Sequence, residues 1–276
     1  MQKKNCRPTI FKTMNNNSGY ITANSRNIYY EFHNLQFRSP NKPILVFLHE
    51  GLGSCAQWKD FPKQISDQSE CTMLMYDRYG YGKSEMLNEL RDNDYMDIEG
   101  FDSLPDLLEK LNINEKVILI GHSDGGTIAL LFASKYREKV LGVITEADHI
   151  FCEEITYQGF RATLKHFESG VLKRVLYKYH QEKTETMFHG WCDTWLSEGG
   201  KIWNVEKHLK NITSPVLSIQ GKDDAYGSVE QLISKLKNVS GTIEILFIEN
   251  CGHEPHFQAK ELVQRKMMEF ISKIQF

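Results

Sequence analysis

The chain has 276 residues, of which 41% are hydrophobic and 25% charged, and its formal net charge at pH 7 is −3. This length suits one large domain, or a domain with an insertion, and it can bury a core without disulfide or metal support. The slightly acidic balance argues against a general nucleic-acid binder, and no apolar run is long enough to span a membrane.

The N-terminus and the cysteines indicate the compartment. Residues 1–20 are polar and rich in asparagine, without the apolar stretch of a secretory signal. The six cysteines are scattered and form no C-x-x-C pair, so a zinc site is not expected. We therefore expect a cytoplasmic protein with reduced thiols, in which residues 1–19 are a loose lead-in.

Short apolar runs alternate along the chain with longer helical stretches. In chain order the predicted strands are 27–32, 44–48, 72–76, 117–120, 140–144, 216–219 and 243–248. The predicted helices are 57–66, 100–111, 127–136, 229–236 and 259–274. This alternation predicts an α/β fold with a doubly wound, mostly parallel sheet.

The alternation stops between residues 148 and 210, where helical stretches occur without a convincing buried strand. We expect a helical cap there, inserted between a first part of the core (1–147) and a second part (211–276). Some of its aromatic residues must pack the cap's own core, and several are expected to line an apolar pocket. The ten aromatic residues of this segment are Phe151, Tyr157, Phe160, Phe167, Tyr177, Tyr179, Phe188, Trp191, Trp195 and Trp203.

The central motif is Gly121-His122-Ser123-Asp124-Gly125-Gly126, which lies between a predicted strand and a predicted helix. Glycines without a Cβ permit the sharp turn, and in this context G-x-S-x-G marks a nucleophile. The N-terminus of the following helix favours an anion. Ser123 is therefore the candidate nucleophile. His122 is expected to be structural, because neighbouring side chains diverge on a sharp turn.

A serine nucleophile needs a base, and the base needs a group that orients it. Asp224 follows the predicted strand 216–219, and His253 follows the predicted strand 243–248. Both thus lie at carboxyl ends of strands, where doubly wound sheets place their sites. The chain order Ser, Asp, His is that of the α/β-hydrolases.

Five segments together resemble the α/β-hydrolase superfamily, in particular small capped serine carboxylesterases and related C–C hydrolases. They are His49-Glu50-Gly51-Leu52-Gly53-Ser54, residues 77–84, the Ser123 turn, the Asp224 loop and Gly252-His253. The resemblance covers roughly residues 27–275. One departure is Glu50, where many relatives have glycine.

This resemblance implies a division of labour. Ser123 would attack a carbonyl, His253 would take and return the proton, and Asp224 would hold the imidazole in the right tautomer. The main-chain N–H of Asp124 would be one oxyanion donor. The second would come from Gly51, with Leu52 as the alternative.

Other residues compete for these roles. Asp223 is a turn residue or the true acid, although the family spacing G-x-x-D favours Asp224. Asp148 lies where some relatives keep their acid, and otherwise makes a hinge hydrogen bond. His256 is an alternative base, or packs near the last helix. Asp77 and Arg78 either bind substrate or, as the favoured interpretation, form an ion pair that stabilises the turn and supports the floor of the site.

These features favour a serine hydrolase that cleaves a carboxylic ester with an apolar acyl chain. No metal, nucleotide or flavin signature is present, so no cofactor is expected. The alternatives are hydrolysis of a C–C bond in a vinylogous diketone and a ligand-binding protein on a hydrolase fold.

A charged stretch of the cap bears on partners. From Lys165 to Lys178 four basic residues, which include Lys173 and Arg174, face only one acid, Glu168. This is either a solvated helix face or a docking patch for an acidic partner. The resemblance to esterases of this superfamily implies that such a partner would be an acyl carrier protein that presents a methyl ester. No nucleic-acid partner is expected.

Overall fold

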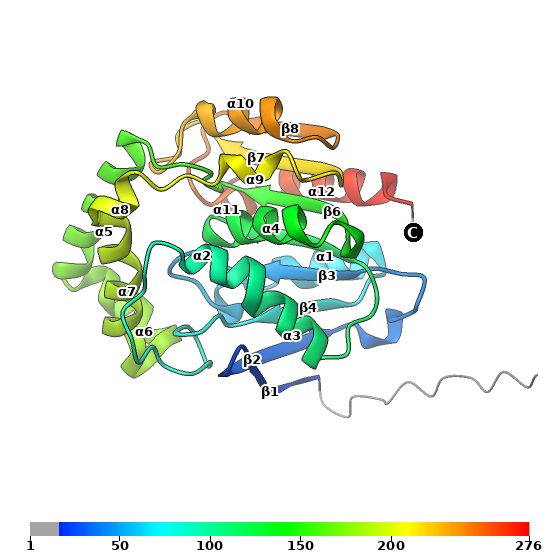
Figure 1. Cartoon of the computed structure of the whole chain (residues 1–276), viewed down its shortest axis with the longest axis horizontal. Coiled ribbons are helices and arrows are strands. Elements are labelled where there is room, and N and C mark those ends of the chain that lie inside the picture. The colour runs from blue at the N-terminus through cyan, green and yellow to red at the C-terminus, as the bar shows by residue number, and fades with distance from the viewer. Residues whose placement is uncertain (1–16, 276) are drawn as a thin grey trace, which may run out of the picture.

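The computed structural model describes residues 17–275 and contains one eight-stranded sheet, with the strand order β1-β2-β4-β3-β5-β6-β7-β8 (Figure 1). The strands pair in parallel from β4 to β8, while β1 and β2 form an antiparallel edge. The predicted fold class is confirmed. The strands are β1 Ser18–Ala23, β2 Arg26–His33, β3 Ile44–Leu48, β4 Met73–Tyr76, β5 Val117–His122, β6 Val140–Glu146, β7 Val216–Gly221 and β8 Ile243–Ile248.

Helices cover both faces of the sheet. One hydrophobic cluster joins the sheet to α3 (Leu104–Lys110) and α4 (Asp124–Lys135), and a second joins it to α1 (Phe61–Ser69) and α12 (Lys260–Lys273). Every residue of β3 and β5 is buried, which explains why these strands are continuous apolar runs. Shorter or peripheral helices are α2 Tyr95–Ile98, α10 Val229–Asn238 and α11 Pro255–Gln258.

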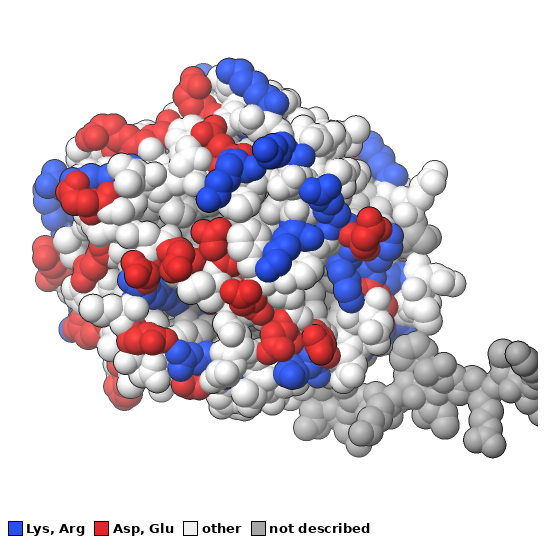
Figure 2. Space-filling model, in the orientation of Figure 1, with Lys and Arg blue, Asp and Glu red and all other residues white. Residues whose placement is uncertain are grey.

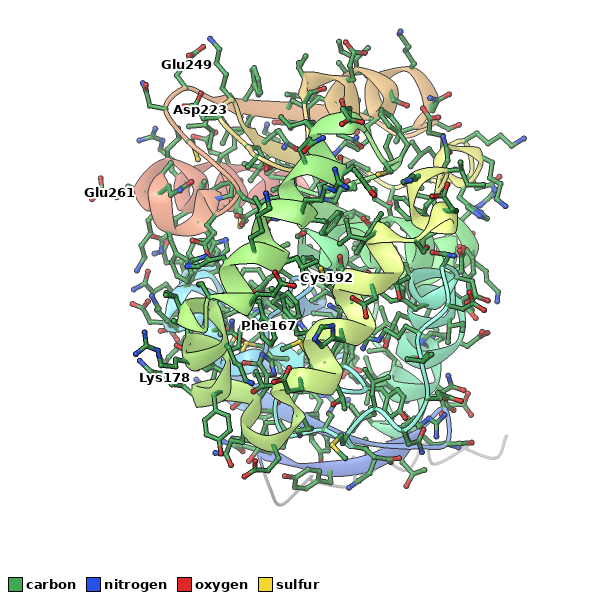
Figure 3. All side chains as sticks on the ribbon, turned by 90° about the vertical axis from the view of Figure 1, so that its left-hand side faces the viewer. Phe167, Lys178, Cys192, Asp223, Glu249 and Glu261 are labelled. Atoms are coloured by element: carbon green, nitrogen blue, oxygen red, sulfur yellow. The ribbon has the colours of Figure 1, made fainter. Side chains whose placement is uncertain are left out.

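Residues 148–210, here called the cap segment, lie between β6 and β7 and form a layer at the left of Figure 1. Figure 3 faces this layer, with Phe167 between the helices and Lys178 directed outward. An isolated bridge pairs Phe151 with Asn204. The helices of the segment are α5 Glu154–Glu168, α6 Val171–His180, α7 Thr184–Leu196, α8 Glu198–Lys201 and α9 Glu206–Leu209.

Strand β1 corrects the expected lead-in of residues 1–19, because Ser18 and Gly19 belong to it; residues 1–16 lie outside the described part. The strand has no apolar run, since it is a half-exposed edge. Its pairing with β2 depends on Asn24 and Ser25, whose φ values of 44° and 61° give the turn that suits a two-residue hairpin.

Two helices also start elsewhere than predicted. Instead of one helix over 100–111, the helical stretch begins earlier, with α2, and continues through a π-helical turn at Glu99–Ser103 into α3. Helix α1 begins at Phe61, because Pro62 suits the first turn of a helix and the preceding residues form a 3-10 turn. Within residues 17–275, none of the helices combines the length and apolarity needed to cross a membrane.

Candidate active site

Ser123 lies on a strained turn between β5 and α4, with φ 52° and ψ −120°. Two glycines make this turn possible. A Cβ on Gly121 would lie 2.2 Å from the carbonyl oxygen of Gly125, and a Cβ on Gly125 would lie 2.0 Å from the carbonyl oxygen of Leu48. Larger residues would therefore push the turn out of place, and with it the Ser123 hydroxyl.

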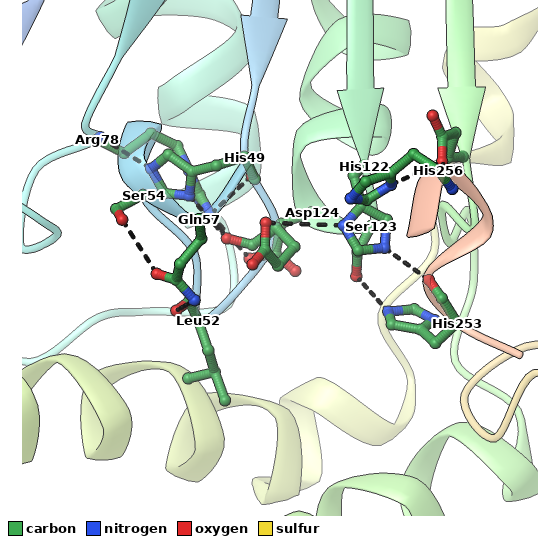
Figure 4. Close-up of polar contacts among 12 residues, drawn as sticks. His49, Leu52, Ser54, Gln57, Arg78, His122, Ser123, Asp124, His253 and His256 are labelled. Carbon is green, nitrogen blue, oxygen red and sulfur yellow. Dashed lines mark hydrogen bonds and ion pairs between the residues drawn. The ribbon is translucent and has the colours of Figure 1, made fainter. Parts of the chain in front are cut away.

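The three expected residues form one hydrogen-bonded chain. The His253 ring lies with Nε2 3.0 Å from Ser123 Oγ and with Nδ1 2.9 Å from Asp224 Oδ1 (Figure 4 shows the Ser123 contact). Asp224 also accepts hydrogen bonds from the Gln220 amide at 2.7 Å and from the main-chain N–H of Tyr226 at 2.9 Å. Burial acts to raise the pKa of Asp224, but the neighbouring His253 and the main-chain N–H of Tyr226 help to outweigh it and keep the pKa below its ordinary value.

The competing residues lie elsewhere. Asp223 is exposed at the β7 end (Figure 3). Asp148 is fully buried and pairs with the equally buried Lys235 at 2.5 Å, so it joins the start of the cap segment to α10. His256 lies in α11 with Nδ1 2.9 Å from Glu146. None of these three competing residues therefore takes part in the hydrogen-bonded series Ser123–His253–Asp224.

The loop after β3 is anchored through one carbonyl group. The Glu50 oxygen accepts hydrogen bonds from Arg78 Nη2 and from His49 Nδ1, both at 2.8 Å, and from Gly53 N–H at 3.1 Å. His49 Nε2 in turn accepts from Arg78 N–H at 3.1 Å. In a trans peptide the N–H points opposite to the carbonyl, so the Gly51 N–H is turned away from Arg78. This arrangement supports Gly51 as an oxyanion donor.

Arg78 connects this loop to the turn that carries Ser123. Its partner is Asp124, so the expected ion pair with Asp77 is wrong. Its guanidinium lies 3.5 Å from the carboxylate of Asp124, and both side chains are buried. Asp124 also accepts a hydrogen bond from Tyr95 at 2.7 Å. Because Asp124 is the first residue of α4, its own N–H has no acceptor within the helix and is free for an oxyanion. Asp77 instead accepts from main-chain N–H groups, at 2.7 Å from Lys83.

Aromatic rings surround His253. His149 stacks on His253 with 5.9 Å between ring centroids, and Tyr226 approaches the same ring at 4.5 Å. Phe160 of α5 contacts Tyr226 and stacks on Trp195 of α7. Burial, and then His253, lower the pKa of His149 to about 4, so this ring is neutral. The sequence analysis missed His149 and Tyr226, although each lies beside a strand end that it had identified.

Five of the ten aromatic residues of the cap segment show two different locations. Phe160 and Trp195 belong to the wall near His253, and Trp191 packs on Gly51, where a Cβ would lie 2.0 Å from its indole nitrogen. Phe167 and Phe188 stack on each other in the cap segment's own core, at 3.6 Å between centroids.

Comparisons with known proteins agree with this architecture. A family model described as the alpha/beta hydrolase fold matches residues 43–160. A proline iminopeptidase of Saccharolobus solfataricus is 25% identical over 304 residues, covering 95% of this chain and 94% of its own.

Solved structures give the same result. A thermophilic esterase from Thermogutta terrifontis has a TM-score of 0.70 and 20% identity, over 94% of this chain and 99% of its own. A meta-cleavage product hydrolase from Pseudomonas fluorescens IP01 has a TM-score of 0.71 and 18% identity, over 92% and 97%.

A parallel sheet of this order, with a serine on a strained turn between a strand and a helix, is typical of proteins with the α/β-hydrolase fold. This chain has the α/β-hydrolase fold, and the known proteins that it resembles include a peptidase, an esterase and a meta-cleavage product hydrolase.

Proposed function

We propose that this protein is a serine hydrolase that cleaves carboxylic esters with an apolar acyl chain. The observation that carries the proposal is the hydrogen-bonded chain Ser123–His253–Asp224 on the strained turn. In this mechanism Ser123 Oγ attacks the carbonyl carbon while His253 Nε2 accepts its proton. The same imidazole then protonates the leaving alkoxide, and a water molecule hydrolyses the acyl-enzyme by the reverse route.

The oxyanion of each tetrahedral intermediate would be bound by the N–H groups of Asp124 and Gly51. The hydrogen bonds of Arg78 and His49 to the Glu50 carbonyl support this role, because they orient the Gly51 peptide before substrate arrives. A donor that needs no reorganisation is worth about 3 kcal/mol in the transition state.

The apolar acyl chain is inferred from the aromatic wall. Phe160, Trp195 and Tyr226 contact one another beside His253, and rings of this size favour hydrocarbon over charged groups. The chemistry of Ser123, His253 and Asp224 does not distinguish one acyl group from another. The apolar character of the acyl chain is therefore inferred from the aromatic wall alone.

A fluorophosphonate probe and a series of p-nitrophenyl esters of graded chain length test the proposal. We expect Ser123 to be labelled and the Ser123→Ala variant to be unlabelled, with ester turnover lowered at least about 10⁴-fold. Ser240→Ala, an exposed serine, is the matched control and should behave like the parent. Full labelling of Ser123→Ala, by intact mass, would remove Ser123 from the mechanism.

A second candidate is hydrolysis of a peptide bond after an N-terminal proline. It is favoured by the proline iminopeptidase relative, which matches nearly the whole chain. A prolyl p-nitroanilide separates the two: turnover of that amide above that of p-nitrophenyl butyrate would favour the peptidase. A ring-fission dienone tests C–C hydrolysis in the same way, and we expect little turnover of it.

The substrate could be delivered by a carrier. We propose that an acidic acyl carrier protein docks on the outer helices of the cap segment, where Lys165, Arg174 and Lys178 are exposed. Lys173 forms an ion pair with Glu185, which reduces the charge of this patch. Acidic and basic groups also alternate over the cap end of the face in Figure 2, so any steering would be modest and sensitive to salt. The proposed compartment is the cytoplasm.

A further inference from the structure

A second histidine lies against the base, in a chain of contacts that starts in the loop after β3. The carboxylate of Glu50 is 3.6 Å from His122 Nδ1. His122 Nε2 is 2.7 Å from the main-chain carbonyl oxygen of His253, a contact drawn in Figure 4. The His122 side chain is buried, with only 2% exposed. Gly53 makes room for the carboxylate, since a Cβ there would lie 2.3 Å from Glu50 Oε2.

The two ring nitrogens of His122 have different surroundings. Nε2 donates a hydrogen bond to the His253 carbonyl, whereas Nδ1 lies at ion-pair distance from the Glu50 carboxylate, too far for a hydrogen bond. A neutral imidazole has one N–H, which the His253 carbonyl requires on Nε2, so Nδ1 would then turn a lone pair toward the carboxylate. The imidazolium keeps the hydrogen bond and turns a positively charged N–H toward Glu50, so the geometry favours a His122 that carries its proton.

The surrounding charges favour the same state. Burial acts to lower the pKa of His122, but Glu50, helped by Glu146, outweighs it and raises the pKa to about 9. Burial acts to raise the pKa of Glu50, but the neighbouring His122 outweighs it and lowers the pKa to about 2. The other titratable groups that face His122 are the rings of His253 and His256, with centroids at 5.1 and 4.9 Å.

We propose that Glu50 and His122 form a positioning pair: the imidazolium of His122, held by Glu50, fixes the His253 carbonyl and so sets the His253 ring against Ser123. This rests on the proposed function, because it matters only if His253 is the base. Neither residue touches the reacting atoms in this role.

The Glu50–His122 pair also links the proposed oxyanion donor Gly51 to the proposed base His253. The Glu50 carbonyl belongs to the peptide that carries the Gly51 N–H, and the Glu50 side chain reaches the base through His122. The two residues before His253 are held by other hydrogen bonds. The Cys251 carbonyl accepts from Asp223 N–H at 2.8 Å, and Gly252 N–H donates to Gln258 at 2.7 Å. Loss of the His122 contact would free the residue that must stay within reach of Ser123.

The experiment combines kinetics with histidine NMR on the full chain. The kinetic part measures kcat and KM for p-nitrophenyl butyrate from pH 6 to pH 10 in the parent and in Glu50→Gln and His122→Gln. Glu115→Gln is the matched control, because Glu115 is also a buried acid in an ion pair, with Arg38 at 2.7 Å, but lies before β5 at the opposite end of the sheet. Melting temperatures establish that each variant is folded.

We expect the pH profile of kcat in the parent to have a descending limb near pH 9, because His122 loses its proton there. In Glu50→Gln the buried imidazole is no longer stabilised as a cation, so this limb should disappear and kcat should be about 10- to 100-fold lower throughout, as expected for a displaced base. KM should change less than about twofold, since neither residue binds substrate. Glu115→Gln should keep the limb and the kcat of the parent.

The NMR part is independent of activity. With ¹⁵N-histidine labelling, and with His122→Gln to assign the signals, we expect both nitrogens of His122 to be protonated at pH 7. A singly protonated His122 at that pH, a parent profile that is flat to pH 10, or a limb that survives in Glu50→Gln would each overturn the pair. Activity that persists in Ser123→Ala would instead overturn the proposed function, while leaving the NMR result to judge the charge state.

Discussion

The strand-end loops of the core and the cap segment meet at Ser123, but they are built differently. In the loops, polar groups are held by several partners at once: the Glu50 carbonyl accepts three hydrogen bonds, and Asp224 accepts from Gln220, Tyr226 and His253. The cap segment contributes mainly rings: Phe160 stacks on Trp195, and Trp195 donates a single hydrogen bond, to Tyr95 at 3.0 Å.

This difference indicates that the strand-end loops and the cap segment determine different properties, the chemistry and the choice of substrate. Groups held by several hydrogen bonds cannot shift without leaving a buried polar atom unpaired, which costs about 1–3 kcal/mol, so the loops fix the chemistry. Packed rings can be exchanged for others of similar volume at lower cost, so the cap segment is suited to set the choice of substrate. The following variants test this division, from the largest expected effect to the smallest.

The largest effect after loss of the nucleophile is expected for Asp224→Asn. The amide would favour the wrong tautomer of His253, and kcat for p-nitrophenyl butyrate should fall about 10⁴-fold. Asp223→Asn is the neighbouring control and should stay within about tenfold, because Asp223 does not reach His253. Equal losses in both variants would mean that the loop, rather than one carboxylate, supports the base.

Asp148→Asn should separate stability from chemistry. The change leaves Lys235 buried without its counter-charge, so the free energy of unfolding should fall by about 3–5 kcal/mol in urea titrations. Turnover by the folded fraction should stay within about tenfold, because the pair joins the cap segment to α10 and does not touch His253. An inactive but stably folded variant would show instead that the acid is Asp148, at the start of the cap segment.

Phe160→Ala should alter the choice of ester rather than the rate of chemistry. Removal of this ring opens space beside Tyr226 and Trp195, so kcat/KM should shift by roughly tenfold in favour of longer or bulkier acyl chains. Tyr177→Ala, at an exposed position of the cap segment, is the control and should leave the chain-length profile unchanged. An unchanged profile in Phe160→Ala would remove this ring from the acyl pocket.

The smallest effect is expected for the double variant Lys173→Glu and Arg174→Glu on the outer face of α6. With a carrier-bound ester KM should rise several-fold, and the rise should shrink as salt shortens the Debye length below about 8 Å. Hydrolysis of a free p-nitrophenyl ester should not change. If both substrates respond alike, the patch is only solvated surface.

Local pattern was sufficient for much of the core. Buried parallel strands must be apolar on both faces, so β3, β5 and β7 are evident in the sequence as continuous hydrophobic runs, and glycines mark the turn that carries Ser123. Asp224 and His253 could be chosen because the carboxyl ends of parallel strands meet at one edge. Strand β1 was missed, since an exposed edge strand has no such run.

Only the tertiary structure decided which groups pair across the site. Arg78 was expected to pair with Asp77, its neighbour in the chain, yet it pairs with Asp124, and His122 reaches the carbonyl of His253 although 131 residues separate them. The sequence by itself determined which strand end each group occupies, because that follows from local periodicity. The contact partner of each buried group depends on how the loops and the cap segment close over the sheet, and no local pattern encodes that packing.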